Sequence, residues 1–280
     1  SQSRDIVALH AELFGKHGIT TIRNFDALND VGNLVYSGRC IAEAGLKHQV
    51  CITMMALPPG WEGGHDADAY TKVLRQILDA GVAFDSVCFM DASGTVVPST
   101  VYATITGARQ MLPEGTGVHF STRDTAGLAV AANIAALEAE ADTIDLALAP
   151  CSGGPTQPDL LVMWHTLQGT EYELDIDIHK VREVEAFYRE CMKAYRSPLG
   201  ALCIDPMVIW NPMPGGAVAA QLLGDRGMVE KYPDMVRVMG EVIQRGGGAI
   251  SVSAVRKAYL EQALNNVTFG PWKIMAESYA

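Results

Sequence analysis

Residues 5–150 alternate short apolar runs with longer amphipathic segments. The short runs are rich in β-branched residues and end in polar residues or glycine, which predicts strands at 20–25, 48–54, 86–90, 117–121 and 143–147. The longer segments repeat apolar residues at helical spacing, which predicts helices at 5–17, 30–44, 66–80, 98–112 and 126–139. Strict alternation with short connections indicates a parallel sheet covered by helices.

Right-handed crossovers make such a chain either a doubly wound sheet or a (β/α)8 barrel. A complete barrel takes roughly 250 residues, and three further units would take about 90. Because only five strands are predicted, we expect a parallel α/β fold derived from a (β/α)8 barrel, with about five of its eight βα units, over residues 1–156.

The alternation stops near residue 157, and a second region is expected over residues 157–280. Its segments 181–195, 217–223 and 233–245 have helical spacing, and prolines at 198, 206, 212 and 214 interrupt them. This pattern predicts a mainly helical C-terminal region. No apolar run of 18 residues occurs, so no transmembrane segment is expected.

Composition narrows the classes of partner and compartment. The net charge of -11 disfavours nucleic acid, because an acidic chain repels a phosphate backbone. The six cysteines include no C-x-x-C pair and lie mostly in apolar runs, so we expect reduced thiols. The first residues lack a signal-peptide pattern, and we therefore expect a cytoplasmic protein.

Polar residues collect where the predicted strands end. The carboxyl ends of parallel strands meet at one edge of the sheet, so these residues predict a site there. They are Arg23, Asp26, Asn29, Asp91, Arg123, Asp124 and, after the fifth strand, Thr156. Helix capping is the competing interpretation, since Asp30, Ser99 and Thr125 lie at the starts of predicted helices and can accept from their free N–H groups. Capping does not account for two arginines and three further aspartates in the same places.

Several of these stretches carry a family resemblance. They are F-D-A-L-N-D-V-G-N-L at 25–34, M-D-A-S-G at 90–94, S-T-R-D-T-A-G at 121–127, S-G-G-P-T-Q-P at 152–158, P-M-P-G-G at 212–216 and N-N-V-T-F-G-P-W at 265–272. Together, in this order, they resemble the carboxyltransferase domain shared by pyruvate carboxylase, the α subunit of oxaloacetate decarboxylase and transcarboxylase. The resemblance covers nearly the whole chain.

The resemblance implies a (β/α)8 barrel followed by a helical funnel, and carboxyl transfer between carboxybiotin and a 2-oxo acid. It also implies a metal held by an aspartate, a carbamylated lysine and two histidines, with a threonine that moves a proton. This sequence departs from that pattern at each position that can be aligned. The lysine position is Met90, the histidine positions are Ser121 and Arg123, and the threonine position is Ala219. The first-strand aspartate has no counterpart.

These departures remove a divalent-metal site. A thioether and a hydroxyl are poor ligands for Zn²⁺ or Mn²⁺, and Arg123 adds a fixed positive charge. We therefore expect no metal and no tightly bound cofactor, with biotin visiting on a carrier protein. The catalytic candidates are Arg123, Asp124 and Asp91, and the substrate-binding candidates are Arg23, Asp26, Asn29 and Thr156.

Three functions stay open. The first is a carboxyltransferase-like subunit of a biotin-dependent carboxylase or decarboxylase complex, acting on a pyruvate- or oxaloacetate-type acid with a degenerate, metal-free site. The second is a metal-independent lyase or transferase in which Arg123 stabilises an enolate or carboxylate. The third is a non-catalytic scaffold, whose charged residues form an ion-pair cluster. An exposed parallel edge at 20–25 predicts a second polypeptide that covers the barrel, and hence an oligomer.

Overall fold

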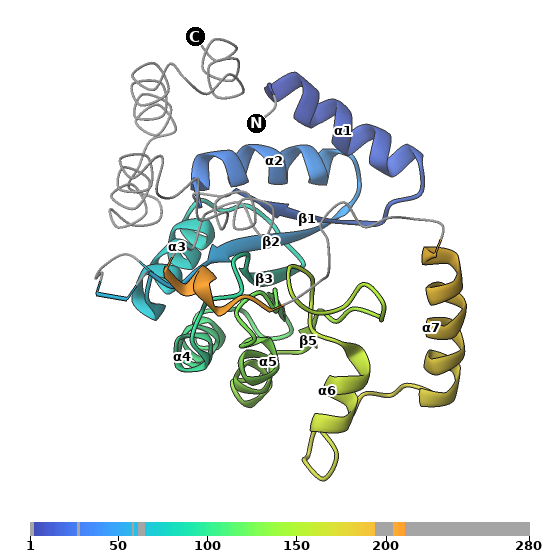
Figure 1. The fold of residues 1–280 in the computed structure, drawn as a ribbon. Coiled ribbons are helices and arrows are strands. Elements are labelled where there is room, and N and C mark those ends of the chain that lie inside the picture. Colours follow the sequence, from blue (N-terminus) through green and yellow to red (C-terminus); the bar gives the residue numbers. More distant parts are fainter. Residues whose placement is uncertain (1–2, 27–28, 58, 61–64, 194–203, 211–280) are drawn as a thin grey trace, which may run out of the picture.

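A computed structural model describes residues 3–26, 29–57, 59–60, 65–193 and 204–210 (Figure 1). The helices are α1 (Arg4–Lys16), α2 (Val31–Glu43), α3 (Ala67–Asp79), α4 (Pro98–Arg109), α5 (Ala129–Glu138), α6 (Leu160–Thr166) and α7 (Ile178–Met192), with a short 3-10 turn, η1 (Pro206–Trp210). The strands are β1 (Thr21–Phe25), β2 (Lys47–Met54), β3 (Ser86–Asp91), β4 (Gly117–Thr122) and β5 (Thr143–Ile144).

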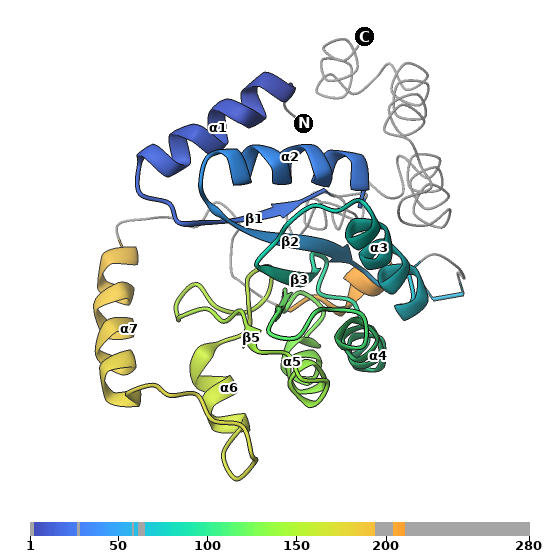
Figure 2. The ribbon, with the colours of Figure 1, turned by 180° about the vertical axis from the view of Figure 1, so that it is seen from behind.

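The five strands form one parallel sheet in the order β1-β2-β3-β4-β5. Each strand is followed by a helix, and α2 to α5 lie along the outer face of the sheet, as the two views in Figures 1 and 2 show. Sequential neighbours with helical crossovers are the arrangement of a (β/α) barrel. The prediction of a parallel, barrel-derived fold with five βα units is confirmed.

The two faces of the sheet differ in chemistry because side chains alternate along each strand. The outer face buries Val50, Ile52, Phe89 and Phe120 against helices that contribute side chains such as Tyr70. Full burial of one such side chain stabilises the fold by about 1.5–3 kcal/mol. This apolar layer is the core on which the helices pack.

The inner face is polar. Arg23, Gln49 and Ser86 are register partners on β1, β2 and β3, and so project from this face together. An ion pair of 2.6 Å joins Arg23 of β1 to Asp145, which follows β5. Since β1 and β5 are the two outer strands of the sheet, the sheet is curved enough for their side chains to meet. The inner face is therefore concave, as in a barrel wall.

Several element boundaries differ from the prediction, and two of them lie near the candidate site. The strand predicted at 143–147 ends at Ile144, and Ala147 instead forms an isolated bridge with Asp159. The helix predicted at 126–139 begins at Ala129. The backbone N–H of Asp124 donates to the Thr156 carbonyl at 2.9 Å, which keeps residues 124–128 in a turn.

The C-terminal region is helical where it is described. Helix α7 corresponds to the helix predicted at 181–195 but begins and ends three residues earlier. Its buried Glu185 accepts a hydrogen bond of 3.3 Å from the Ala149 N–H. The predicted helices at 217–223 and 233–245, the two last family stretches and Ala219 lie outside the described residues. No helix in the described ranges is both long and apolar enough to cross a membrane.

Candidate functional site

Arg123 and Asp124 follow the carboxyl end of β4 and meet the loop at 151–157. Nη1 of Arg123 donates to the Pro155 carbonyl at 3.4 Å. Asp124 forms an isolated antiparallel bridge with Gly154, besides its backbone contact with Thr156. Three predicted site residues, Arg123, Asp124 and Thr156, are thus brought together at one place.

The loop at 151–157 is folded around the Thr156 hydroxyl. Oγ1 of Thr156 lies 2.6 Å from the Cys151 carbonyl and 2.9 Å from the Gly153 carbonyl. Gly153 and Gly154 both have positive φ, which glycine adopts without steric cost. The loop therefore presents its backbone to Arg123 in a fixed shape.

Arg123 has donors to spare. A guanidinium carries five N–H donors, and in the described part of the chain Arg123 has a single long hydrogen bond, to Pro155. Its side chain is half-buried. A half-buried guanidinium with unused donors is suited to bind a carboxylate in bidentate fashion.

Asp124 lies in a less polar environment than an exposed carboxyl. Burial raises its pKa above the ordinary value, although the Ala129 N–H donates to its carboxylate at 3.3 Å and acts in the opposite direction. Asp124 therefore binds a proton more readily than an exposed aspartate does.

Asp91 is fully buried at the end of β3 and organises the loop after it. Its carboxylate accepts hydrogen bonds from the N–H groups of Gly94 at 2.9 Å, Thr95 at 3.3 Å and Val96 at 3.0 Å. The Thr122 hydroxyl lies 3.1 Å from the same carboxylate. Burial raises the pKa of Asp91, and these hydrogen bonds partly offset that effect.

Asp26 and Asn29 lie where β1 passes into α2. The carboxylate of Asp26 accepts from the Asp30 N–H and from the Asn33 amide, each at 3.0 Å. The Asn29 amide bonds both the N–H and the C=O of Thr53 at 2.8 Å, with Asn29 itself at a φ of 54°. Asn29 therefore fastens the β1–α2 loop to β2, and the Asp26 carboxylate ties that loop to the start of α2.

Arg23 lies on the concave face, in a cluster that the sequence did not reveal. Its guanidinium contacts Asp145 at 2.6 Å, Gln49 at 2.6 Å and His119 at 3.1 Å. His119 also contacts Asp145 at 2.6 Å. Burial would raise the pKa of Asp145, but hydrogen bonds from His119, Arg23 and Ser121 outweigh it and hold that pKa well below the ordinary range.

Asp145, His119 and Gln49 were missed as members of this cluster. Asp145 directly follows a β-branched pair at the end of β5, and that position was the one available signal. His119 is a register partner of Cys88 on the concave face, and strand alternation predicts its place there. Strand alternation does not predict its partner Asp145.

The resemblance assigns its metal-ligand positions to Met90, Ser121 and Arg123 in this chain. Thr53, Met90 and Ser121 are register partners and share the concave face. Ser121 is buried and hydrogen bonds to Asp145. Among the residues that the structure describes, no three His, Cys, Asp or Glu side chains are grouped to hold a metal ion. The donor set at the three positions does not fit a divalent metal.

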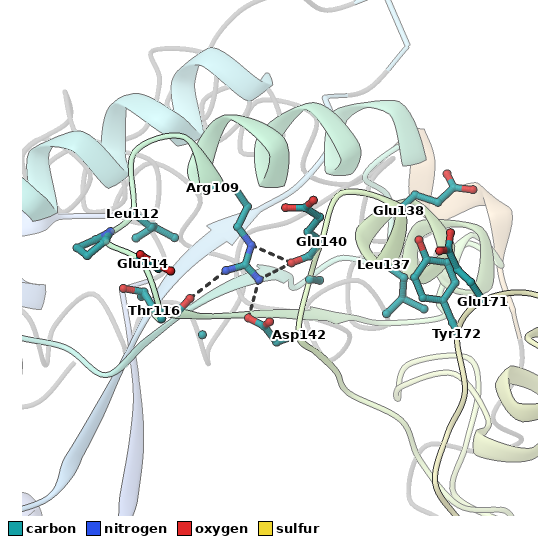
Figure 3. Close-up of a pocket in the computed structure, with 14 residues that line it drawn as sticks. Arg109, Leu112, Glu114, Thr116, Leu137, Glu138, Glu140, Asp142, Glu171 and Tyr172 are labelled. Carbon is teal, nitrogen blue, oxygen red and sulfur yellow. Dashed lines mark hydrogen bonds and ion pairs between the residues drawn. The ribbon is translucent and has the colours of Figure 1, made fainter.

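A cavity of about 810 Å³ lies at the other end of the sheet (Figure 3). Its lining includes five carboxylates, those of Glu114, Glu138, Glu140, Asp142 and Glu171. Arg109 donates there to the Thr116 carbonyl at 3.0 Å, to Asp142 at 2.6 Å and to the Glu140 carbonyl. This negative lining disfavours an acidic ligand.

No protein-family model matches the chain. The pyruvate carboxylase B subunit of Methanocaldococcus jannaschii is 26% identical over 270 residues, which are 94% of this chain and 46% of that protein. The methylmalonyl-CoA carboxyltransferase 5S subunit of Propionibacterium freudenreichii is 22% identical over 280 residues, which are 99% of this chain and 54% of that protein. The chain thus spans about half the length of these two curated relatives.

The same resemblance holds in three dimensions. The carboxyl transferase domain of Rhizobium etli pyruvate carboxylase, solved with pyruvate and biocytin, aligns with a TM-score of 0.73 at 25% identity. The alignment covers 95% of this chain and 45% of that chain. This chain is a homologue of pyruvate carboxylase B subunits and of the transcarboxylase 5S subunit, with the fold of a pyruvate carboxylase carboxyltransferase domain.

Proposed function

We propose that this chain is a carboxyltransferase-like subunit of a biotin-dependent carboxylase or decarboxylase complex that acts on a 2-oxo acid of the pyruvate or oxaloacetate type. The observation that carries the proposal is the half-buried Arg123 guanidinium at the carboxyl ends of the strands, most of whose donors have no partner among the described residues. Homology to pyruvate carboxylase chains supports the class of substrate.

Arg123 would bind the carboxylate of the 2-oxo acid through two parallel N–H donors. Such a pair combines charge with planar geometry and is among the stronger hydrogen-bonded contacts in proteins. The loop at 151–157 would limit the positions open to the acid, because Pro155 and Thr156 hold it against Arg123 and Asp124.

We propose that the site works without a metal and is degenerate relative to its relatives. A cation beside Arg123 would be repelled at short range, and Ser121 already hydrogen bonds to Asp145. The cluster of Arg23, His119 and Asp145 occupies the concave face with balanced charge. Catalysis by this chain alone would accordingly be weak or absent.

The contacts of the site candidates separate residues that position loops from residues that face the ligand. We propose that Asp91, Asp26 and Asn29 position the loops around the site and touch no substrate, because backbone groups engage each of them. Arg23 would hold the curvature of the sheet through Asp145 and would not contact the acid. Thr156 keeps the loop at 151–157 in shape, while Arg123 and Asp124 face the ligand.

Biotin would be a visiting cofactor, delivered on a carrier protein or domain, and it would bring or remove the carboxyl group that is transferred. No tightly bound cofactor is part of the proposal. The five described cysteines are free thiols, which fits a reducing compartment, and we propose the cytoplasm.

Calorimetric titration of the full chain with pyruvate tests the proposal. We expect millimolar or tighter binding, and at least tenfold weaker binding in Arg123→Gln, about 1.4 kcal/mol. Arg75→Gln, on the exposed side of α3, removes the same charge elsewhere and should leave the dissociation constant unchanged. If the wild type shows no heat and no thermal shift far above millimolar pyruvate, the chain is a scaffold and the proposal is wrong.

A metal-independent lyase is a second candidate, favoured by the raised pKa of Asp124 beside Arg123. Asp124 could then donate a proton to an enolate that Arg123 stabilises. Oxaloacetate decarboxylation in the presence of EDTA, with no biotin carrier, distinguishes the two. If the wild type turns over oxaloacetate and Asp124→Asn does not, the lyase is supported. If the wild type shows no turnover, the lyase is wrong and the carrier-dependent function is favoured.

We propose that a second polypeptide covers the β1 edge. Within the described ranges β1 pairs with β2 only. Five large apolar side chains near this edge are 36–56% exposed, namely Leu9, Leu13, Phe14, Ile19 and Phe25. An apolar surface beside an open strand edge favours association.

Sedimentation velocity of the purified full chain tests the proposed oligomer. We expect a mass above the 30.1 kDa of one chain, and a shift toward that value in Leu13→Glu. Val162→Glu introduces the same charge at another exposed apolar position, on α6, and should leave the assembly intact. A wild type that sediments as a monomer contradicts the proposal.

A further inference from the structure

We propose that Gly94 is a positioning residue for Arg123. Gly94 lies in the loop after β3 with a φ of 70°. A Cβ at this position would lie 2.5 Å from the Arg123 carbonyl oxygen, 3.0 Å from the Arg123 carbonyl carbon and 3.0 Å from the Thr125 nitrogen. The loop therefore packs directly on the peptide group between Arg123 and Asp124, an approach that only glycine permits.

The loop that carries Gly94 is itself held rigidly. The buried Asp91 carboxylate accepts the N–H groups of Gly94, Thr95 and Val96, at 2.9–3.3 Å. The Ser93 hydroxyl lies 3.2 Å from the same carboxylate. A methyl group added at 94 could not be accommodated by movement of this loop without breaking hydrogen bonds to a buried carboxylate.

Arg123 is also held by three hydrogen bonds, two at its backbone and one at its guanidinium. The Asp91 carbonyl accepts the Arg123 N–H at 3.3 Å. The Thr122 hydroxyl lies 3.1 Å from the Arg123 carbonyl oxygen and 3.1 Å from the Asp91 carboxylate. The Pro155 carbonyl accepts from the Arg123 guanidinium on the side of the loop at 151–157. Displacement of the Arg123 peptide would therefore change where its guanidinium is presented.

Gly81 provides a matched control. Its φ is 68°, nearly that of Gly94, and a Cβ at Gly81 would meet nothing within 4 Å. Ala at either position incurs the same backbone strain, but only Gly94→Ala places an atom against Arg123. A difference between the two variants in the reactivity of Arg123 or in ligand binding then reports on the contact with Arg123.

The test compares Gly94→Ala and Gly81→Ala in the full chain by two measurements. The first is the rate at which phenylglyoxal modifies Arg123, followed by peptide mass spectrometry. We expect this rate to change by roughly threefold or more in Gly94→Ala. In Gly81→Ala it should stay within about 1.5-fold of the wild-type rate. The second is the dissociation constant for pyruvate, expected to rise about tenfold in Gly94→Ala alone.

Thr122→Val supplies a second variant should Gly94→Ala fail to fold. It removes the hydroxyl between Asp91 and the Arg123 carbonyl, and it should change the modification rate in the same direction, about twofold, with Thr122→Ser restoring it. An unchanged rate in every folded variant overturns the role of Gly94. The pyruvate measurement rests on the proposed function. If the wild type binds no pyruvate while the modification rates differ, the proposed function fails and the positioning role stands.

Discussion

Arg109 and Arg123 lie at opposite ends of the same sheet and use their guanidinium groups differently. Arg109 donates to two backbone carbonyls and to Asp142, and so fastens the loops before β4 and β5 (Figure 3). The Arg123 guanidinium makes one hydrogen bond, of 3.4 Å, in the described part of the chain. Residue type alone therefore does not distinguish the two ends of the sheet, whereas the number of guanidinium donors engaged by described residues does.

The surroundings of the two arginines reinforce this contrast. The cavity beside Arg109 is lined with carboxylates and would repel a 2-oxo acid. The end with Arg123 combines that cation with Asp124, whose pKa is raised by burial. A sizeable cavity can therefore lie at the structural end of a sheet, and its size alone says little about ligands.

The largest effect is expected at the structural end. Arg109→Met should lower the free energy of unfolding by about 3 kcal/mol, because it leaves two carbonyl oxygens and Asp142 without their charged donor. Urea denaturation measures this. Arg75→Met, on an exposed helix face, is the control and should change stability by less than about 0.5 kcal/mol. Equal stability of the two variants would break the contrast between Arg109 and Arg123.

A smaller loss is expected at the concave face between the two ends. Asp145→Asn should cost about 2 kcal/mol at neutral pH, because Arg23 and His119 lose their shared anion. The pKa of Asp145 is held below its ordinary value of about 3.9, so its stabilisation is complete above that pH and is lost as the pH falls through the folded-state pKa.

Urea denaturation of wild type and Asp145→Asn at several pH values checks this dependence. The difference in unfolding free energy should be constant from about pH 7 to pH 5 and should shrink below about pH 4. A difference that grows on acidification would show that another group is responsible.

Glu140→Gly should stabilise the structural end. Glu140 has a φ of 69°, and its carbonyl, rather than its carboxylate, holds Arg109. Glycine adopts this backbone conformation without strain, so we expect a gain of about 0.5–1 kcal/mol in thermal or urea unfolding. Glu138→Gly, at the last residue of α5, should instead lose stability, because its backbone is helical. Losses of the same size in both variants would contradict strain at Glu140.

The smallest effect on stability is expected for Arg123→Gln. Its single long hydrogen bond predicts a change within about 0.5 kcal/mol in urea denaturation. The same variant is expected to lose pyruvate affinity, so stability and binding should separate at this end of the sheet. A loss of stability as large as that of Arg109→Met would make Arg123 a structural residue as well.

The sequence predicted the strands closely where apolar, β-branched runs are long. The ranges 48–54, 86–90 and 117–121 each lie within one residue of β2, β3 and β4. The fifth strand was predicted too long, because Ala147 pairs with Asp159 rather than with β4. The pairing of Ala147 thus depends on Asp159, which lies later in the chain, and not on the strand pattern itself.

The candidate site was predicted in part. Proximity of Arg123, Asp124 and Thr156 followed from the rule that strand ends share an edge, and the structure brings them together. Asp91 and Asn29 were also candidates, but their side chains form buried hydrogen bonds to backbone groups. Residue type alone does not predict such bonds. The cluster of Arg23 with Asp145 joins residues 122 positions apart.

By itself the sequence determined the alternation of strands and helices, the parallel sheet and the family, because apolar periodicity and short signature stretches are local properties of the chain. Only the tertiary structure decided which charged groups are engaged. It pairs Arg23 with Asp145 and binds Arg109 to carbonyls, while in the part of the chain that is described most donors of the Arg123 guanidinium have no partner. Hydrogen-bond partners are set by curvature and by loops distant in sequence, and these arise only when the elements pack together.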